Sequence, residues 1–100
     1  MSRSRFTITP EELVAFRDCL SSRICPRIFR ILLRNSVLNI SAIARKARCN
    51  NNDALRHLRN LAKLGIAEEE FFAGVHSFTL KRVEFTGLME EAIKVMEERR

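Results

Sequence analysis

The sequence lacks a long hydrophobic run, and this absence argues against a membrane protein. No apolar stretch among the 100 residues approaches the roughly 20 that a membrane-spanning helix requires. The first residues, MSRSRFTITP, also lack the apolar segment of a secretory signal. We therefore expect a cytoplasmic protein.

Cysteine is scarce, which argues against the disulfide-rich class of small proteins. The three cysteines, Cys19, Cys25 and Cys49, are odd in number and form no CxxC pair, so a disulfide framework within one chain is not expected. We expect buried or free thiols. A disulfide through Cys19 or Cys25 that joins two subunits stays open as an alternative.

The sequence also shows no regular spacing of metal ligands. The three cysteines, His57 and His76 stand at irregular intervals, and no two of them are four residues apart. We expect neither a metal site nor a cofactor. His57 is expected on the surface of its helix or partly packed.

Signatures of catalysis are absent as well. The chain has no Gly-rich phosphate loop, no paired carboxylates in an apolar frame and no recognisable Ser/His/Asp set. It also has no internal repeats. We therefore expect a protein that is not an enzyme.

What the sequence does contain is an uneven excess of positive charge. The formal net charge is +6 with a pI near 10, in a chain that is 46% hydrophobic and 30% charged. Six cations against one aspartate give residues 45–63 a charge of +5, whereas the chain beyond Ile66 is net acidic. This asymmetry indicates a polyanionic partner on one face. The alternative is that the cations only solvate helix faces.

Local signals predict two helices in the first third of the chain. Thr9 and Glu12 can form a capping box around Pro10, which predicts a helix over 10–21. A second helix is predicted to begin at Pro26, because the residue before a proline disfavours helical angles. Arg27, Arg30 and Arg34 share one face of this second helix, and contact with phosphates and simple solvation are both open for them.

The central segment predicts two helices joined by a polar turn. Asn39 suits the capping position of a short helix, and the run Cys-Asn-Asn-Asn at 49–52 marks a turn. A longer helix is predicted over 53–64, with Gly65 in the left-handed position past its end. Its buried residues are expected to be Leu55, Leu58, Leu61 and Ala62.

The last third predicts a β-hairpin and a closing helix. Residues 66–72 and 75–81 are rich in Phe, Val, Ile and Thr around Ala73-Gly74. Residues 86–100 have a broad apolar helical face that needs a partner. We expect this helix and the helix over 10–21 to form a two-fold homodimer, with packing on their own subunit as the alternative.

Residues 26–82 resemble the winged helix-turn-helix regulators of the ArsR and MarR type, found in bacteria and archaea. The resemblance rests on ISAIARKA at 40–47 and NNDALRHLRNLAKLGI at 51–66, within which RHLxxLxxLGI is the most specific part. Phe78-Thr79-Leu80 resembles the strand that returns from the wing. The implied fold is mainly α with a small β-hairpin (α+β), in a single domain over 1–100.

The resemblance implies a dimeric transcriptional regulator that binds double-stranded DNA and inserts the helix over 53–64 into the major groove. Asparagine can pair with adenine and arginine with guanine, so we expect Asn51, Asn52 and Arg56 to read bases. Phosphate contacts are expected from the remaining cations of the motif. These are Arg45, Lys46, Arg48, Arg59 and Lys63.

The acidic strand of the hairpin keeps two alternatives open. Residues 68–70 are all glutamate, where DNA-binding wings often present Arg or Lys. One alternative is a non-specific, chromatin-like DNA binder. The other is a winged-helix module for protein interaction, whose basic face meets an acidic protein surface.

Overall fold

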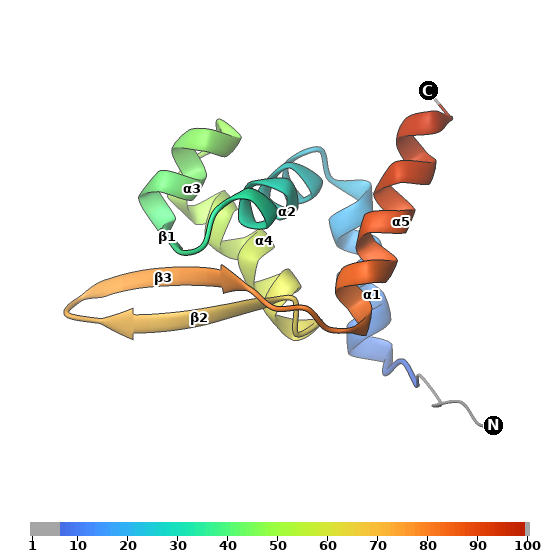
Figure 1. Ribbon diagram of the computed structural model, residues 1–100, viewed down its shortest axis with the longest axis horizontal. Coiled ribbons are helices and arrows are strands. Elements are labelled where there is room, and N and C mark those ends of the chain that lie inside the picture. Colours follow the sequence, from blue (N-terminus) through green and yellow to red (C-terminus); the bar gives the residue numbers. More distant parts are fainter. Residues whose placement is uncertain (1–6, 100) are drawn as a thin grey trace.

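A computed structural model of the chain describes residues 7–99. Its helices are α1 (Pro10–Ser21), α2 (Ile24–Arg34), α3 (Ile40–Ala47), α4 (Asn51–Lys63) and α5 (Glu84–Glu98). Its strands are β1 (Leu38–Asn39), β2 (Ala67–Phe72) and β3 (Val75–Leu80), in the order β1-β3-β2. The predicted α+β architecture is therefore confirmed (Figure 1). None of the described helices combines the length and apolar character that crossing a membrane requires.

Helix α1 begins where its capping signals predict. The Thr9 hydroxyl accepts a hydrogen bond from the Glu12 amide, and the Glu12 carboxylate accepts one from the Thr9 amide. These reciprocal bonds satisfy two amides that a helix start otherwise leaves without partners.

Helix α2 begins at Ile24, two residues earlier than predicted. Pro26 lies in its first turn, where an amide proton has no helical partner and its absence costs nothing. The Ser22 hydroxyl accepts from the amides of Ile24 and Cys25 and so holds this turn in place. The rule for residues before proline failed here because these local bonds outweigh it.

Asparagine side chains start both α3 and α4. The Asn39 side chain accepts from the Ala42 amide, and the Asn50 side chain accepts from the Asp53 amide. Since Asn50 is the cap, α4 starts at Asn51 and not at Asp53 as predicted. Gly65 adopts the expected left-handed conformation after α4, with φ of 78°.

The β-hairpin forms as predicted, with Phe72 opposite Val75 at its turn. In the segment before α3, Leu38 pairs with Phe78 and Asn39 with Ser77. The resulting strand β1 is too short to leave a pattern in the sequence. Its pairing fixes the hairpin against the start of α3.

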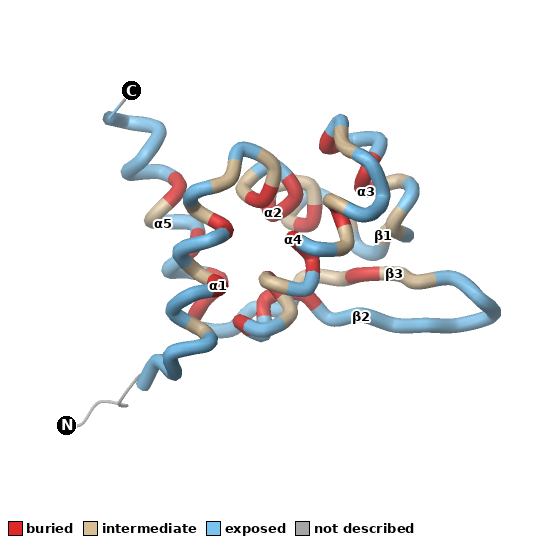
Figure 2. Tube along the Cα trace, turned by 180° about the vertical axis from the view of Figure 1, so that it is seen from behind, coloured by how far each residue is buried: buried red, intermediate tan, exposed pale blue. Residues whose placement is uncertain are grey.

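Helix α4 lies at the centre of the core and packs against α1, α2, α3 and β2. Its buried residues are Ala54, His57, Leu58 and Leu61, whereas Leu55 and Ala62 are only half-buried, unlike the prediction. Figure 2 shows buried residues on the inward sides of the helices and an exposed strand β2, whereas β3 is mostly half-buried and includes the buried Phe78. Truncation of Leu58 or Leu61 to alanine would cost about 2–5 kcal/mol.

The expectation of unpaired thiols within one chain is wrong for two of the three cysteines. Cys19 at the end of α1 and Cys25 at the start of α2 form an intrachain disulfide, with their Cα atoms 5.0 Å apart. The tight turn between the two helices brings them together, which their spacing alone did not indicate. Cys49 is a free thiol whose pKa is raised, chiefly by burial.

Candidate nucleic-acid interface

The outward side of α4 presents one continuous polar stripe. Asn52, Arg56, Arg59 and Lys63 follow one another at helical spacings of four, three and four residues, and all four are exposed. This stripe lies opposite the buried residues that anchor α4 in the core. The helix is therefore held by one side and free to meet a ligand with the other.

The three predicted base readers lie together in the first turns of α4. Asn51 is exposed, and its amide nitrogen lies 3.5 Å from the Ser41 hydroxyl on α3. Asn52 is exposed one residue further along. Arg56 lies one turn later and pairs with Asp53 at 3.2 Å. An exposed ion pair of this kind contributes about 0–1 kcal/mol, so Arg56 can exchange it for another partner at little cost.

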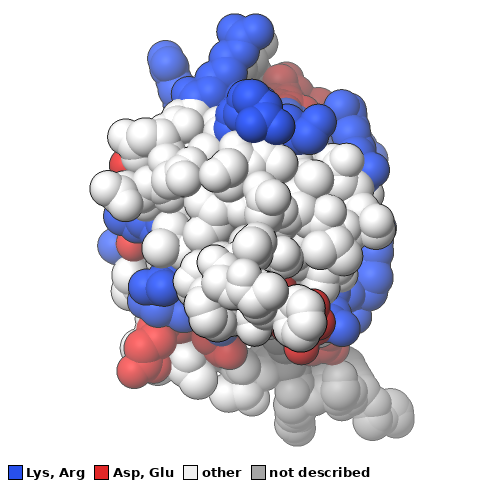
Figure 3. Space-filling view, turned by 90° about the vertical axis from the view of Figure 1, so that its left-hand side faces the viewer, with Lys and Arg blue, Asp and Glu red and all other residues white. Residues whose placement is uncertain are grey.

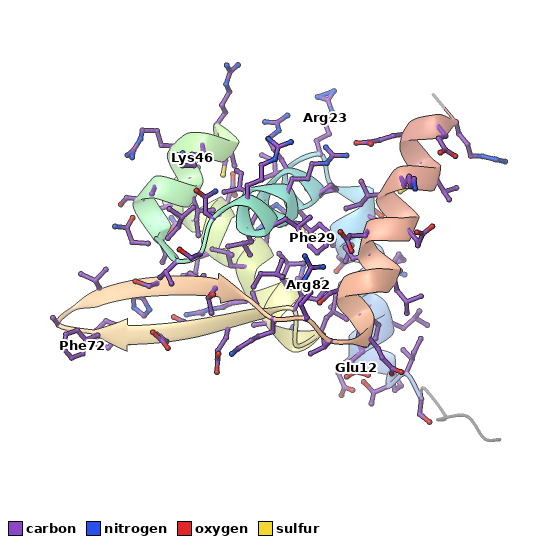
Figure 4. The ribbon with its side chains drawn as sticks, viewed as in Figure 1. Glu12, Arg23, Phe29, Lys46, Phe72 and Arg82 are labelled. Atoms are coloured by element: carbon purple, nitrogen blue, oxygen red, sulfur yellow. A yellow bond between two sulfur atoms is a disulfide. The ribbon has the colours of Figure 1, made fainter. Side chains whose placement is uncertain are left out.

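The predicted phosphate contacts fall into two groups. Arg45 and Lys46 occupy the last turn of α3, and Arg48 follows in a left-handed conformation with φ of 62°. Figure 4 shows Lys46 extending from the far end of α3 into solvent. Arg59 and Lys63 extend the stripe along α4. All five cations are exposed and available to an anionic ligand.

Two of the arginines on α2 have partners inside the chain. The Arg27 guanidinium donates to the Ala47 carbonyl at 2.8 Å and so caps the end of α3, and Arg30 pairs with Glu97 on α5. Arg34 is exposed near the end of α2. The partners of Arg27 and Arg30 come from α3 and α5, and contact with phosphates and solvation stay open for these arginines.

The glutamates of β2 are partly neutralised within the hairpin. Glu68 pairs with Lys81 at 2.9 Å, and Glu69 pairs with His76. The hydrogen bond that the Lys81 ammonium donates to the Glu68 carboxylate is the largest cause of the raised pKa of Lys81, which keeps that ammonium charged. The acidic strand therefore presents less net charge than its sequence suggests.

His57 is more deeply buried than expected. Only 5% of its surface is exposed, its Nε2 lies 3.5 Å from the Ser22 hydroxyl, and its Nδ1 has no hydrogen-bond partner among the described residues. Burial lowers its pKa, and the neighbouring Arg56 lowers it further. Its spacing from Ala54 and Leu61 is the signal that could have placed it on the buried face.

Comparison with solved structures identifies the architecture. The homodimeric DNA-binding domain of Mb0332 from Mycobacterium bovis aligns with a TM-score of 0.69 at 17% identity, over 89% of this chain and 82% of that one. The antimony-specific transcriptional repressor AntR aligns with a TM-score of 0.67 at 18% identity, over 97% and 90%. The fold is a winged helix-turn-helix. Reduced HlyU from Vibrio cholerae aligns with a TM-score of 0.64 at 18% identity, over 84% and 87%.

In the winged helix-turn-helix fold, α3 and α4 are the helix-turn-helix, α4 is the recognition helix, and β2 with β3 is the wing. The stripe from Asn52 to Lys63 thus lies on the outward face of the helix that has the position of the recognition helix in this fold. No protein-family model and no curated protein matches the sequence.

Proposed function

We propose that the chain is a non-enzymatic, dimeric regulator of transcription that binds double-stranded DNA through α4. The observation that carries this proposal is the exposed stripe of Asn52, Arg56, Arg59 and Lys63, opposite a buried anchoring face. Amide and guanidinium groups at the start of a recognition helix suit base edges in the major groove. Cations further along the helix and at the end of α3 suit phosphates.

A two-fold dimer is part of the proposal. Helices α1 and α5 expose Leu13, Val14, Leu88 and Val95, although each helix also packs on its own subunit. Phe16 and Phe85 hold the two helices together, with ring centroids 5.8 Å apart. A second copy would cover the exposed apolar side chains and place two recognition helices roughly 34 Å apart along the duplex.

Binding of duplex DNA at two salt concentrations tests the proposal. If the dimer neutralises roughly six to ten phosphates, affinity should fall about a thousandfold or more between roughly 50 and 200 mM salt. The double variant Arg59→Gln with Lys63→Gln should reduce both the affinity and the salt dependence. Arg82→Gln is the control, because it removes an exposed cation that lies outside both the stripe and the exposed apolar side chains of α1 and α5. Absence of binding at low salt would overturn the proposal.

Two further readings remain as outcomes of this experiment. Equal affinity for all duplex sequences, with no preferred site recovered by selection, would favour a non-specific DNA binder. No DNA binding, together with binding of an acidic protein surface, would favour a protein-interaction module.

A further inference from the structure

The tip of the wing exposes two aromatic side chains, of which Phe71 contacts the His76 ring with the ring centroids 4.4 Å apart. Phe72 is 83% exposed and Phe71 63% exposed, and Val75 stands directly opposite Phe72. Figure 3, which looks onto this end of the molecule, shows uncharged side chains across the middle of the face. An exposed apolar cluster of this kind marks a contact surface.

The charge of the wing argues against DNA as the ligand of this cluster. Residues 67–81 contain three glutamates and one lysine, Lys81, which pairs with Glu68, so their net charge is −2 with histidine neutral. Glu70 forms no ion pair within residues 7–99 and stands next to Phe71. An acidic and aromatic tip is complementary to a basic surface with an apolar floor.

The chain carries such a surface at its other end. A hollow of about 460 Å³ lies between the end of α1, the start of α2 and α5, at the end of the long axis opposite the wing tip (Figure 1). Its apolar lining comes from Leu20, Pro26, Ile93 and Met96. Its charged lining comes from Arg23, Arg27, Arg30 and Glu97. Arg30 pairs with Glu97 and Arg27 donates to the Ala47 carbonyl, so Arg23 is the cation of this lining with no such partner among the described residues.

We propose that the wing tip of one copy docks into this α2–α5 hollow of a second copy. Phe72 and Phe71 would enter the apolar floor, and Glu70 would pair with Arg23, which Figure 4 shows extending into solvent. A central aromatic anchor inside a ring of complementary charge is the arrangement that interfaces favour.

The contact joins two different surfaces, so it does not close on itself and extends from copy to copy. One hairpin tip buries little area, and such a contact is weak in free solution. Dimers bound side by side on DNA are held at a high effective concentration relative to one another. A contact that is weak in free solution therefore forms between them. In this respect the inference rests on the proposed function, and its consequence is cooperative coverage of long DNA.

Sedimentation at increasing protein concentration tests the contact without DNA. We expect species larger than a dimer for the natural chain, and their loss in Phe72→Ser and in Arg23→Glu. A mixture of these two variants should regain them, because one variant keeps its hollow and the other keeps its tip. Larger species that Phe72→Ser leaves unchanged, or a mixture that regains nothing, would overturn the proposal.

Measurements of DNA affinity provide a second test of the contact between copies. Affinity for a long duplex should exceed that for a single-site duplex by about tenfold or more, and Phe72→Ser should abolish this difference. A loss of affinity for the single-site duplex in Phe72→Ser would mean that the tip contacts DNA, which overturns the contact between copies. If the protein binds no DNA, the proposed function fails, and sedimentation alone decides the contact.

Discussion

At the scale of single residues, the exposed side chains of α4 differ in the hydrogen bonds that they can make with DNA in the proposed complex. Asn52 and Arg56 have planar groups that can make paired hydrogen bonds with base edges, whereas a lysine presents only a point charge. We expect Asn52→Ala and Arg56→Ala each to cost about 1–3 kcal/mol on a preferred site. On random DNA the effect of Asn52→Ala should be negligible. Titration of both duplexes by fluorescence anisotropy would measure this difference, and equal losses on both would contradict base reading by Asn52.

His57 makes stability depend on pH. Burial, aided by the Arg56 guanidinium, lowers its pKa below the ordinary value of 6.5, so the folded chain holds this ring neutral. The unfolded chain takes up the proton more readily. The contribution of His57 to stability is therefore complete above pH 6.5 and is lost as the pH falls from there through the lowered pKa.

We expect His57→Leu to remove this part of the acid sensitivity. The substitution also deletes the unpaired Nδ1, so its effect at neutral pH should be small. Urea unfolding of both proteins over a series of pH values would show the result. An identical loss of unfolding free energy on acidification would contradict the role of His57.

At the scale of elements, the Cys19–Cys25 disulfide joins α1 to α2 across a sequence separation of six residues. A loop this short contributes about 2 kcal/mol in the chain-entropy account. We expect the double variant Cys19→Ser with Cys25→Ser to lose roughly that amount in urea unfolding, and reduction of the natural chain to act in the same direction. Cys49→Ser is the control, because its thiol is free, and this variant should keep its sensitivity to reduction.

Elements that depend on local chemistry could be predicted from the sequence. The Thr9 capping box, the Asn39 cap and the Gly65 stop are all settled by a few neighbouring residues, and the structure confirms them. Strand β1 and the disulfide could not be predicted, because each depends on a contact with another element.

The same distinction between local features and contacts with other elements applies to the candidate site. The exposure of the residues chosen on α4 followed from helical periodicity. The internal partners of Arg27 and Arg30 did not, because α3 and α5 supply them. Spacing along one helix can show that side chains share a face, but it cannot show what lies opposite that face.

At the scale of the whole molecule, the proposed dimer rests on the exposed apolar side chains of α1 and α5. A charge buried in an interface without a partner is costly, so Val95→Glu should shift the dimer to monomer and weaken DNA binding at least tenfold, or about 1.4 kcal/mol. Val37→Glu is the matched control, because Val37 is similarly exposed but lies before β1, away from both helices. Sedimentation equilibrium would measure the change, and a dimer that persists in Val95→Glu would contradict this interface.

The position of α4 in the core also limits how the chain could change its target. One side of the helix contacts four other elements, so substitutions there put folding at risk. Four positions on the other side of the helix are exposed, namely Asn52, Arg56, Arg59 and Lys63. Substitutions at exposed positions usually alter the free energy of unfolding by no more than about 0.5 kcal/mol. A new specificity could therefore arise by a few changes on one side of a single helix, with the rest of the scaffold inherited intact.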